Sequence, residues 1–321
     1  MNLRKILLLS IPILIVSCSE REIFEDINQP PITGLFKEIG GNISGDLFYK
    51  ESPYKVVTDI VVPSNQKLTI EPGVEVYFTH NSRLIVNGEL IASGDYYRSI
   101  LFAAYDKSLP WRGIKIYNAS AKSRFDYVFI KDISEPGDPI YNSSGISITN
   151  SQAEFLHTFI YENSAQYGGG IGVYNHSDVI IKNSIFRDNT AYVAGGALVS
   201  ESSKIKIINN HFYQNHSNNK VGGVFIMSPV SAELQNNIFY KNTSLINNPH
   251  FEFESADSTN LIEQYNFFAF GNMDPLFYTP FDLRLFYLSP CKNAGNPETI
   301  FNDYDGSRND QGAYGGPFGY W

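Results

Sequence analysis

The sequence predicts an all-β chain folded as a parallel β-helix, a solenoid with caps at its N- and C-terminal ends. Three observations support this: a repeat of about 26 residues, apolar positions that alternate with polar ones inside each repeat, and asparagines and glycines at fixed places between the apolar runs. A fixed period of this length indicates units that stack on their neighbours, with like residues roughly 4.8 Å apart.

The repeat is clearest between residues 146 and 244. We expect three short strands per unit, with one asparagine column at turns and a second column forming an inward amide ladder. The expected turn column is Asn163, Asn189, Asn215 and Asn242, spaced 26, 26 and 27 residues apart. The expected ladder is His157, Asn183, Asn209 and Asn236. The expected core columns include Ile160, Phe186, Phe212 and Phe239; Ile146, Ile171, Ala197 and Val224; and Ile148, Val173, Val199 and Ile226.

The first 18 residues have the features of an export signal. Arg4 and Lys5 precede an apolar stretch over 6–16 that is short for a membrane span, and Ser17-Cys18 follows it. This segment resembles the bacterial lipobox, which implies a signal peptide over 1–17, lipidation of Cys18 and attachment to a membrane. Ser19 then favours the outer membrane of a diderm bacterium, facing the periplasm or the cell surface. The alternative is an ordinary secretory signal with a chance cysteine.

Residues after the lipobox divide into a tether and a repeat domain. Residues 18–40 contain Pro30-Pro31 and several acids without periodicity, which is typical of a flexible tether. The segments 68–78 and 84–94 resemble the opening coils of bacterial right-handed β-helix repeat proteins with a pectate-lyase-like fold. Segments 289–297 and 303–316 are similar to that group's C-terminal region. The resemblance implies a β-helix over 41–275, an N-terminal cap near 40–60 and a C-terminal cap over 276–321, and leaves the function open.

The charge of the chain argues against nucleic acid as a partner. The formal net charge is −9, and removal of residues 1–17 takes away Arg4 and Lys5 and leaves −11. No run of basic residues offsets this, and an acidic surface repels phosphate backbones.

Catalytic chemistry has only weak candidates. β-Helix enzymes that act on acidic polysaccharides place sets of acids and bases on the outer face, and their motifs are missing; Asp138-Pro139-Ile140 stands where an epimerase has Asp-Pro-His. Arg187 with Glu162 or Asp188 could imitate a lyase site, in which a cation neutralises a uronate and a base removes a proton. The alternative is a solvated ladder of mixed charge.

Binding candidates are more numerous. Tyr161, Arg187, Tyr213 and Tyr240 form one outward column, and Lys241 belongs to the next. The tyrosines could stack on pyranose rings, with Lys241 as a further binding candidate, although such ladders also stabilise coils. Asp303, Asp305 and Asp310 around Gly306 resemble a calcium loop without its terminal Glu, and a hydrogen-bonded turn is the alternative. We expect no zinc site and no cofactor, with calcium as the open possibility.

Three functions therefore remain. The first is a lipid-anchored envelope protein that binds a polysaccharide or a protein partner along its outer face. The second is a polysaccharide lyase or hydrolase acting on acidic glycans. The third is a structural or adhesive surface spacer.

Overall fold

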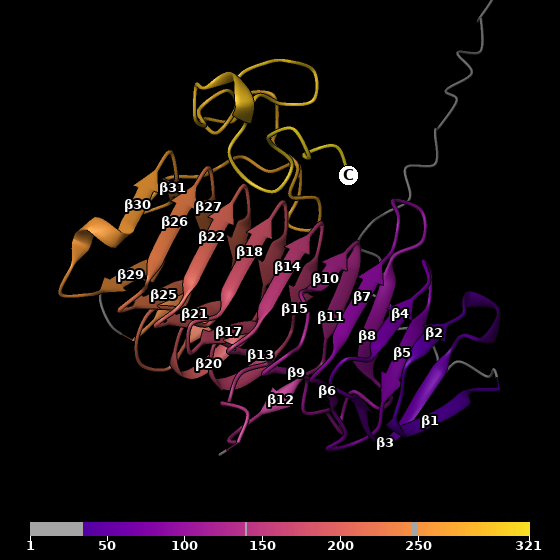
Figure 1. The fold of residues 1–321 in the computed structure, drawn as a ribbon. Helices are drawn as coiled ribbons and strands as arrows, with labels where there is room; N and C mark the ends of the chain where they lie inside the picture. The colour runs from indigo at the N-terminus through magenta and orange to yellow at the C-terminus, as the bar shows by residue number, and fades with distance from the viewer. Residues whose placement is uncertain (1–34, 139, 246–248) are drawn as a thin grey trace, which may run out of the picture.

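The computed structural model describes residues 35–138, 140–245 and 249–321. The strands of its three sheets pair in parallel and wind around one long core, so the chain forms an elongated parallel β-helix (Figure 1). The predicted signal segment, Cys18 and the part of the predicted tether up to residue 34 lie outside the described residues. None of the helices in the described part has the length and apolar character needed to cross a membrane.

One face of the solenoid is a nine-stranded sheet, which means that the chain passes this face nine times. Its strands are β2 (Gly45–Leu47), β4 (Lys67–Ile70), β7 (Glu89–Ser93), β10 (Ser123–Asp126), β14 (Gln152–Leu156), β18 (Asp178–Lys182), β22 (Lys204–Ile208), β26 (Ser231–Gln235) and β30 (Leu261–Gln264).

Two further faces share the long strand β3 (Tyr54–Val62) and form one 17-stranded sheet. The first row continues through β6 (Leu84–Val86), β9 (Ile114–Tyr117), β13 (Ile146–Thr149), β17 (Ile171–Tyr174), β21 (Leu198–Glu201), β25 (Val224–Met227) and β29 (Phe251–Glu254). The second row comprises β1 (Lys37–Asn42), β5 (Glu75–Phe78), β8 (Ile100–Ala104), β11 (Val128–Lys131), β15 (Phe159–Tyr161), β19 (Ile185–Arg187), β23 (His211–Tyr213), β27 (Ile238–Tyr240) and β31 (Phe267–Phe268).

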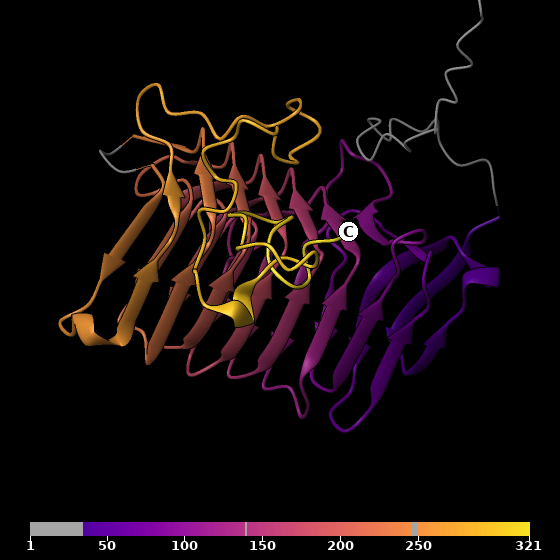
Figure 2. The same ribbon diagram turned by 90° about the horizontal axis from the view of Figure 1, so that it is seen from above.

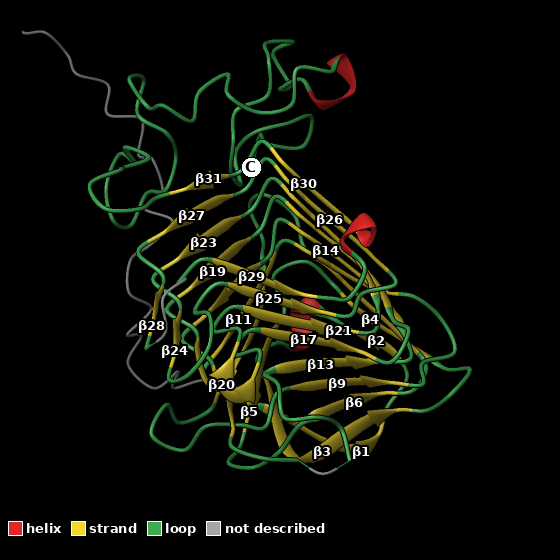
Figure 3. Cartoon of the chain, turned by 90° about the vertical axis from the view of Figure 1, so that its left-hand side faces the viewer, coloured by secondary structure: helices red, strands yellow, loops and turns green. Residues whose placement is uncertain are grey.

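The later coils contain four strands instead of the expected three. A short five-stranded sheet follows the second row, because the turn of each coil is extended enough to pair with the turn of the next coil. Seen end-on, the solenoid has a triangular section with this sheet as an extra side (Figure 3). Its strands are β12 (Ser134–Glu135), β16 (Ser164–Tyr167), β20 (Thr190–Ala194), β24 (His216–Ser217) and β28 (Thr243–Ser244). Three 3₁₀ turns complete the described structure, at Tyr49–Glu51, Ser258–Asn260 and Thr299–Phe301.

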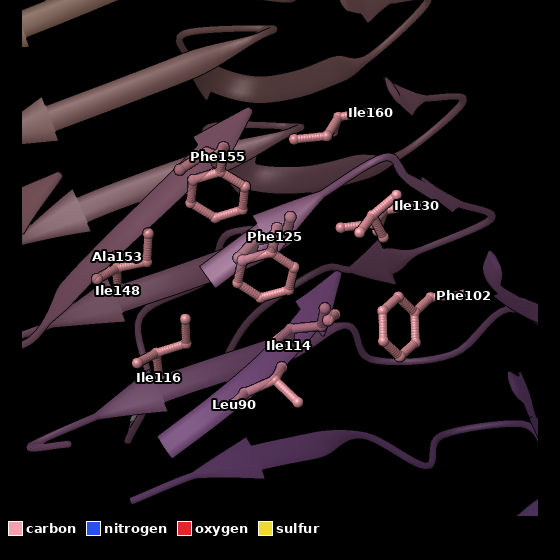
Figure 4. Packing of buried hydrophobic residues seen from close by; sticks show 14 of the residues in the cluster. Leu90, Phe102, Ile114, Ile116, Phe125, Ile130, Ile148, Ala153, Phe155 and Ile160 are labelled. Carbon is pink, nitrogen blue, oxygen red and sulfur yellow. The ribbon is translucent and has the colours of Figure 1, made fainter. Parts of the chain in front are cut away.

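The predicted stacking of like side chains is confirmed. The ring centroids of Phe186 and Phe212 lie 5.0 Å apart, those of Phe212 and Phe239 lie 4.6 Å apart, and each pair is stacked. Earlier coils continue the pattern, since Phe125 lies under Phe155 beside neighbouring rows of isoleucine (Figure 4). Each fully buried Phe stabilises the coil by about 1.5–3 kcal/mol relative to its exposed state, so this stack is a main source of cohesion.

The expected register of one core column is wrong by one residue. Leu198 pairs with Ile171, and Ser200 with Val173, in the positions predicted for Ala197 and Val199. The register shifts in the preceding turn, where Tyr167 pairs with Ala194, and this inserts one extra residue. Val199 therefore points outward, where it is buried in a separate apolar cluster with Val221 and Phe225.

The two asparagine columns have exchanged roles relative to the prediction. The column that includes Asn189 is the buried ladder: the Asn189 side-chain amide donates to Asn215 Oδ1 at 3.0 Å and to the Ile160 carbonyl at 2.8 Å. The left-handed residue is the one before it, such as Gln214 with φ 57°. The other column, His157, Asn183, Asn209 and Asn236, is itself left-handed. A second ladder runs one residue later, through Asn210, Asn237 and Asn266.

The ends of the solenoid differ from the expected caps. β1 pairs with β3 and β2 with β4, so residues 37–62 already belong to the coils, and the predicted boundary at residue 41 lies within β1. After β31, the chain turns back and its last residues lie along one flank of the middle coils (Figures 1 and 2). We call residues 275–321 the returning segment.

The left-handed asparagines hold the returning segment on the flank. The Asn183 side-chain amide donates to the carbonyls of Ala313 and Gly315 at 2.9 and 2.7 Å. The Asn209 amide donates to the Gly312 carbonyl at 3.1 Å. An apolar cluster of Phe159, Ile185, Tyr213, Leu283 and Ala313 fills the contact.

Candidate functional site

The predicted tyrosine column exists but lies largely beneath the returning segment. Tyr161 pairs with Arg187, Arg187 with Tyr213, and Tyr213 with Tyr240, as the repeat predicts. Tyr213 is only 2% exposed, because the returning segment packs over it. The repeat pattern predicts an open flank here. However, Phe159 and Ile185, which neighbour the tyrosine column, are apolar and are buried by Leu283 and Ala313 of the returning segment. A sugar ring cannot reach Tyr213 in this arrangement.

The remaining members of the column have protein partners. The Tyr240 hydroxyl donates to Asp274 at 2.9 Å, and the Lys241 ammonium lies 4.9 Å from the Tyr240 ring centre. Tyr161 is half-buried in contact with the cluster under the returning segment. These contacts explain the column as a stabilising feature of the coil.

The catalytic candidates do not converge on a common point. The Arg187 guanidinium pairs with Asp188 at 2.8 Å and lies over the rings of Tyr213 and Phe281 at 5.6 and 5.4 Å. Glu162 pairs instead with Lys107 at 2.8 Å. A uronate would have to displace Asp188 from Arg187, so this arrangement offers little to an acidic substrate.

The three aspartates of the predicted calcium loop hold turns of the returning segment together. Asp303 accepts hydrogen bonds from the backbone of Asp310 at 3.0 Å and of Gly316 at 2.6 Å. Burial raises the pKa of Asp303 to about 6, although these hydrogen bonds act in the opposite direction. Asp305 accepts from the Ser307 backbone, and Asp310 pairs with Lys292. No group of three or more His, Cys, Asp or Glu side chains able to hold a metal ion occurs within the described part of the chain.

A buried ionic cluster was not expected from the sequence. Lys115 and Glu135 are both fully buried, with Lys115 Nζ 3.4 Å from Glu135 Oε2 and 2.7 Å from the Ser144 carbonyl. Arg112 adds a second ion pair to Glu135 at 2.7 Å. Desolvation lowers the pKa of Lys115 to about 8, against the attraction of Glu135. Lys115 alternates with Ile114 and Ile116 like any outward strand residue, so the pattern gave no signal for its burial.

One exposed aromatic surface lies where the returning segment meets a loop of an early coil. We call it the aromatic groove. Its volume is about 430 Å³, and it is lined by Tyr96, Tyr278, Arg284, Leu285, Lys292, Asp310, Tyr314, Gly319, Tyr320 and Trp321. Three of its rings are strongly exposed: Tyr96 at 53%, Tyr278 at 55% and Tyr320 at 80%. This is an unusual concentration of exposed aromatic side chains around one concave surface.

The loop that presents Tyr96 is held in place by Asp95. Asp95 Oδ1 accepts hydrogen bonds from the backbone of Tyr97 and Arg98 at 3.0 and 2.9 Å, and its other oxygen pairs with the Arg98 guanidinium at 2.8 Å. The loop is therefore ordered before any ligand arrives, which lowers the entropic cost of binding.

The other side of the groove is anchored through Trp321. Its indole nitrogen donates to the Ala313 carbonyl at 2.8 Å, and its ring stacks on Tyr314 with the centroids 5.2 Å apart. Tyr320 stacks in turn on Tyr304 at 5.8 Å. The aromatic richness of residues 276–321 was visible in the sequence, but nothing there indicated that Tyr96 lies against them.

The comparisons with known proteins concern the fold. Residues 112–269 match the family described as "right handed beta helix region", which gives the hand of the solenoid. No curated protein matches the chain. The solved structure of pectate lyase Pel9A is similar, with 13% sequence identity, a TM-score of 0.37, and coverage of 88% of this chain and 84% of that one. A similarity at this level carries no information on activity.

Proposed function

We propose that this right-handed parallel β-helix protein is a bacterial envelope lipoprotein that binds a polysaccharide in the aromatic groove. The observation that supports this most is the meeting of Tyr96, Tyr278 and Tyr320 around one shallow concave surface, from parts of the chain about 200 residues apart. Flat aromatic faces pack on the apolar faces of pyranose rings, and a shallow groove accommodates a polymer that continues beyond it.

The membrane attachment rests on the N-terminal sequence. Arg4-Lys5, the apolar stretch over 6–16 and Ser17-Cys18 support acylation of Cys18 and location at the outer membrane, facing the periplasm or the cell surface. The tether predicted over 18–40 would then leave the solenoid free to meet a polymer near the membrane.

The exposed aromatic rings of the groove favour polysaccharide binding over the lyase and the spacer alternatives. Exposed rings that gather on one concave surface mark a ligand-binding site more often than single exposed rings do, and the groove presents several together with polar groups. The lyase alternative has less support, because Arg187 already pairs with Asp188 and Glu162 pairs elsewhere. A spacer would need no such groove.

Affinity electrophoresis in gels that contain soluble polysaccharides tests the proposal. Tyr96→Ala and Tyr320→Ala remove exposed rings, so the fold should be retained while each loses about 1 kcal/mol of stacking, or about fivefold in affinity. Tyr192→Ala is the matched control, because Tyr192 is 48% exposed but lies on β20, outside the groove. Equal retardation of all four proteins would refute the groove as the site.

A further inference from the structure

We infer that the aromatic groove takes an uncharged polysaccharide rather than an acidic one. The inference rests on the proposed function, since it names the class of polymer bound at the same site. It follows from the charges around the groove, which balance one another before any ligand is present.

Both cations that line the groove have a carboxylate partner. The Arg284 guanidinium donates three hydrogen bonds to the Asp282 carboxylate, at 2.9, 3.1 and 2.6 Å, and lies 6.0 Å from the Tyr278 ring centre. Lys292 pairs with Asp310 at 2.8 Å, and this hydrogen bond raises the pKa of Lys292. A uronate would have to replace one of these carboxylates, and such an exchange of one ion pair for another yields little net attraction.

The wider field also disfavours a polyanion. Asp303 and Asp305 lie near Lys292 and add to the negative field there. The whole chain has a formal net charge of −9. A polymer with a carboxylate on every residue would be repelled during approach, and most strongly at low ionic strength.

The same ion pairs suit sugar hydroxyl groups. A hydroxyl group both donates and accepts hydrogen bonds, and each ion pair presents acceptor oxygens next to donor nitrogens. The phenol groups of Tyr96, Tyr278 and Tyr320 add three further groups that donate and accept at the rim. A neutral polymer therefore finds stacking faces and hydrogen-bond partners without displacing an internal contact.

Two sets of gels test the inference with the full chain. One set contains uncharged polymers (dextran, mannan, β-glucan and galactan), and the other contains polygalacturonate and alginate, each at low and at physiological ionic strength. We expect retardation by at least one uncharged polymer, little change with salt, and none by the acidic polymers. Tyr96→Ala should weaken the retardation about fivefold.

Asp282→Asn provides a charge-specific variant, since it removes the partner of Arg284 and leaves every groove-lining residue in place. It should create weak, salt-sensitive binding of polygalacturonate that the wild type lacks. Retardation of the wild type by acidic polymers, equal to or stronger than by uncharged ones, would overturn the inference but not the proposed function. Absence of retardation by every polymer would overturn the proposed function itself.

Discussion

His211 gives the sharpest test of how the returning segment is held. It lies in the second row of the 17-stranded sheet between Ile185 and Ile238, and it is 1% exposed. Neither ring nitrogen has a hydrogen-bond partner in the described part of the chain, and the ring packs against Phe277 and Tyr314 of the returning segment. Burial lowers the pKa of His211 from 6.5 to about 3.

The direction of the pH effect follows from this lowered pKa. Between pH 6.5 and 3 the unfolded chain binds a proton at His211 and the folded chain does not, so folding stability falls as the pH falls through this window. At pH 5 the loss is about 2 kcal/mol, and at pH 4 it is about 3.4 kcal/mol. The loss of stability at pH 5 depends only on the pKa of His211 in the unfolded chain, as long as its pKa in the folded chain stays well below 5.

Replacement of His211 by the residue of its neighbours in the row should remove the effect. We expect His211→Ile to be more stable than the wild type at pH 7.5 by about 1–3 kcal/mol, because two unpartnered buried nitrogens disappear. At pH 5 the difference should widen by about 2 kcal/mol. Asp303 acts in the opposite direction, since its raised pKa stabilises the fold as the pH falls from 6, but it is common to both proteins and cancels in the comparison.

Urea denaturation of both proteins at pH 7.5 and pH 5, in one buffer of constant ionic strength, measures these differences. His176→Asn is the matched control, because His176 is exposed and its left-handed backbone (φ 62°) tolerates Asn. A stability difference between wild type and His211→Ile that is the same at both pH values would refute the reasoning, whatever its size.

Three other changes test separate parts of the structure. Ser200→Val should raise the free energy of unfolding by about 1–2 kcal/mol, because Ser200 Oγ is buried without a partner opposite Val173 and Ile226; a lower urea midpoint would contradict this. Asn215→Ala should lower the free energy of unfolding by about 2–4 kcal/mol, because it leaves the Asn189 side-chain amide and the Phe186 carbonyl without their Asn215 partner. An unchanged urea midpoint would argue against the asparagine ladder. Cys18→Ser should abolish metabolic incorporation of labelled palmitate and release the protein from membranes in a bacterial host; labelling that persists would exclude Cys18 as the acylated residue.

The stacking of coils was predictable because it depends on like residues recurring at a fixed period, which a single sequence displays. Residues that lie one above another every 4.8 Å must be compatible with their own kind, so Phe186, Phe212 and Phe239 recur in phase. The register error at Val199 arose because the extra residue lies in the turn between the asparagine and the next strand. Spacing measured from one asparagine to the next averages over such a turn and cannot locate it.

The asparagine columns and the groove were beyond the reach of pattern alone. Glu162, Gln214 and Lys241 occupy left-handed positions although their side chains have no special preference for them, so residue propensity pointed to the adjacent Asn instead. The path of the returning segment has no repeat to reveal it. It is fixed by single contacts, such as those from Asn183 to the carbonyls of Ala313 and Gly315, and the groove exists only once that path is set.

The returning segment ties the length of the solenoid to the integrity of the groove. Its hydrogen bonds to Asn209, Asn183 and His157 join residues separated by 100 to 161 positions, across successive coils. Most solenoids tolerate gain or loss of whole units, because each unit touches only its neighbours. Here one coil added between residues 96 and 209 would shift these attachment points by roughly 4.8 Å relative to one another, or carry Tyr96 the same distance away from Tyr320. Selection for the groove would therefore hold the number of coils between these residues constant, even where the repeat itself could be duplicated.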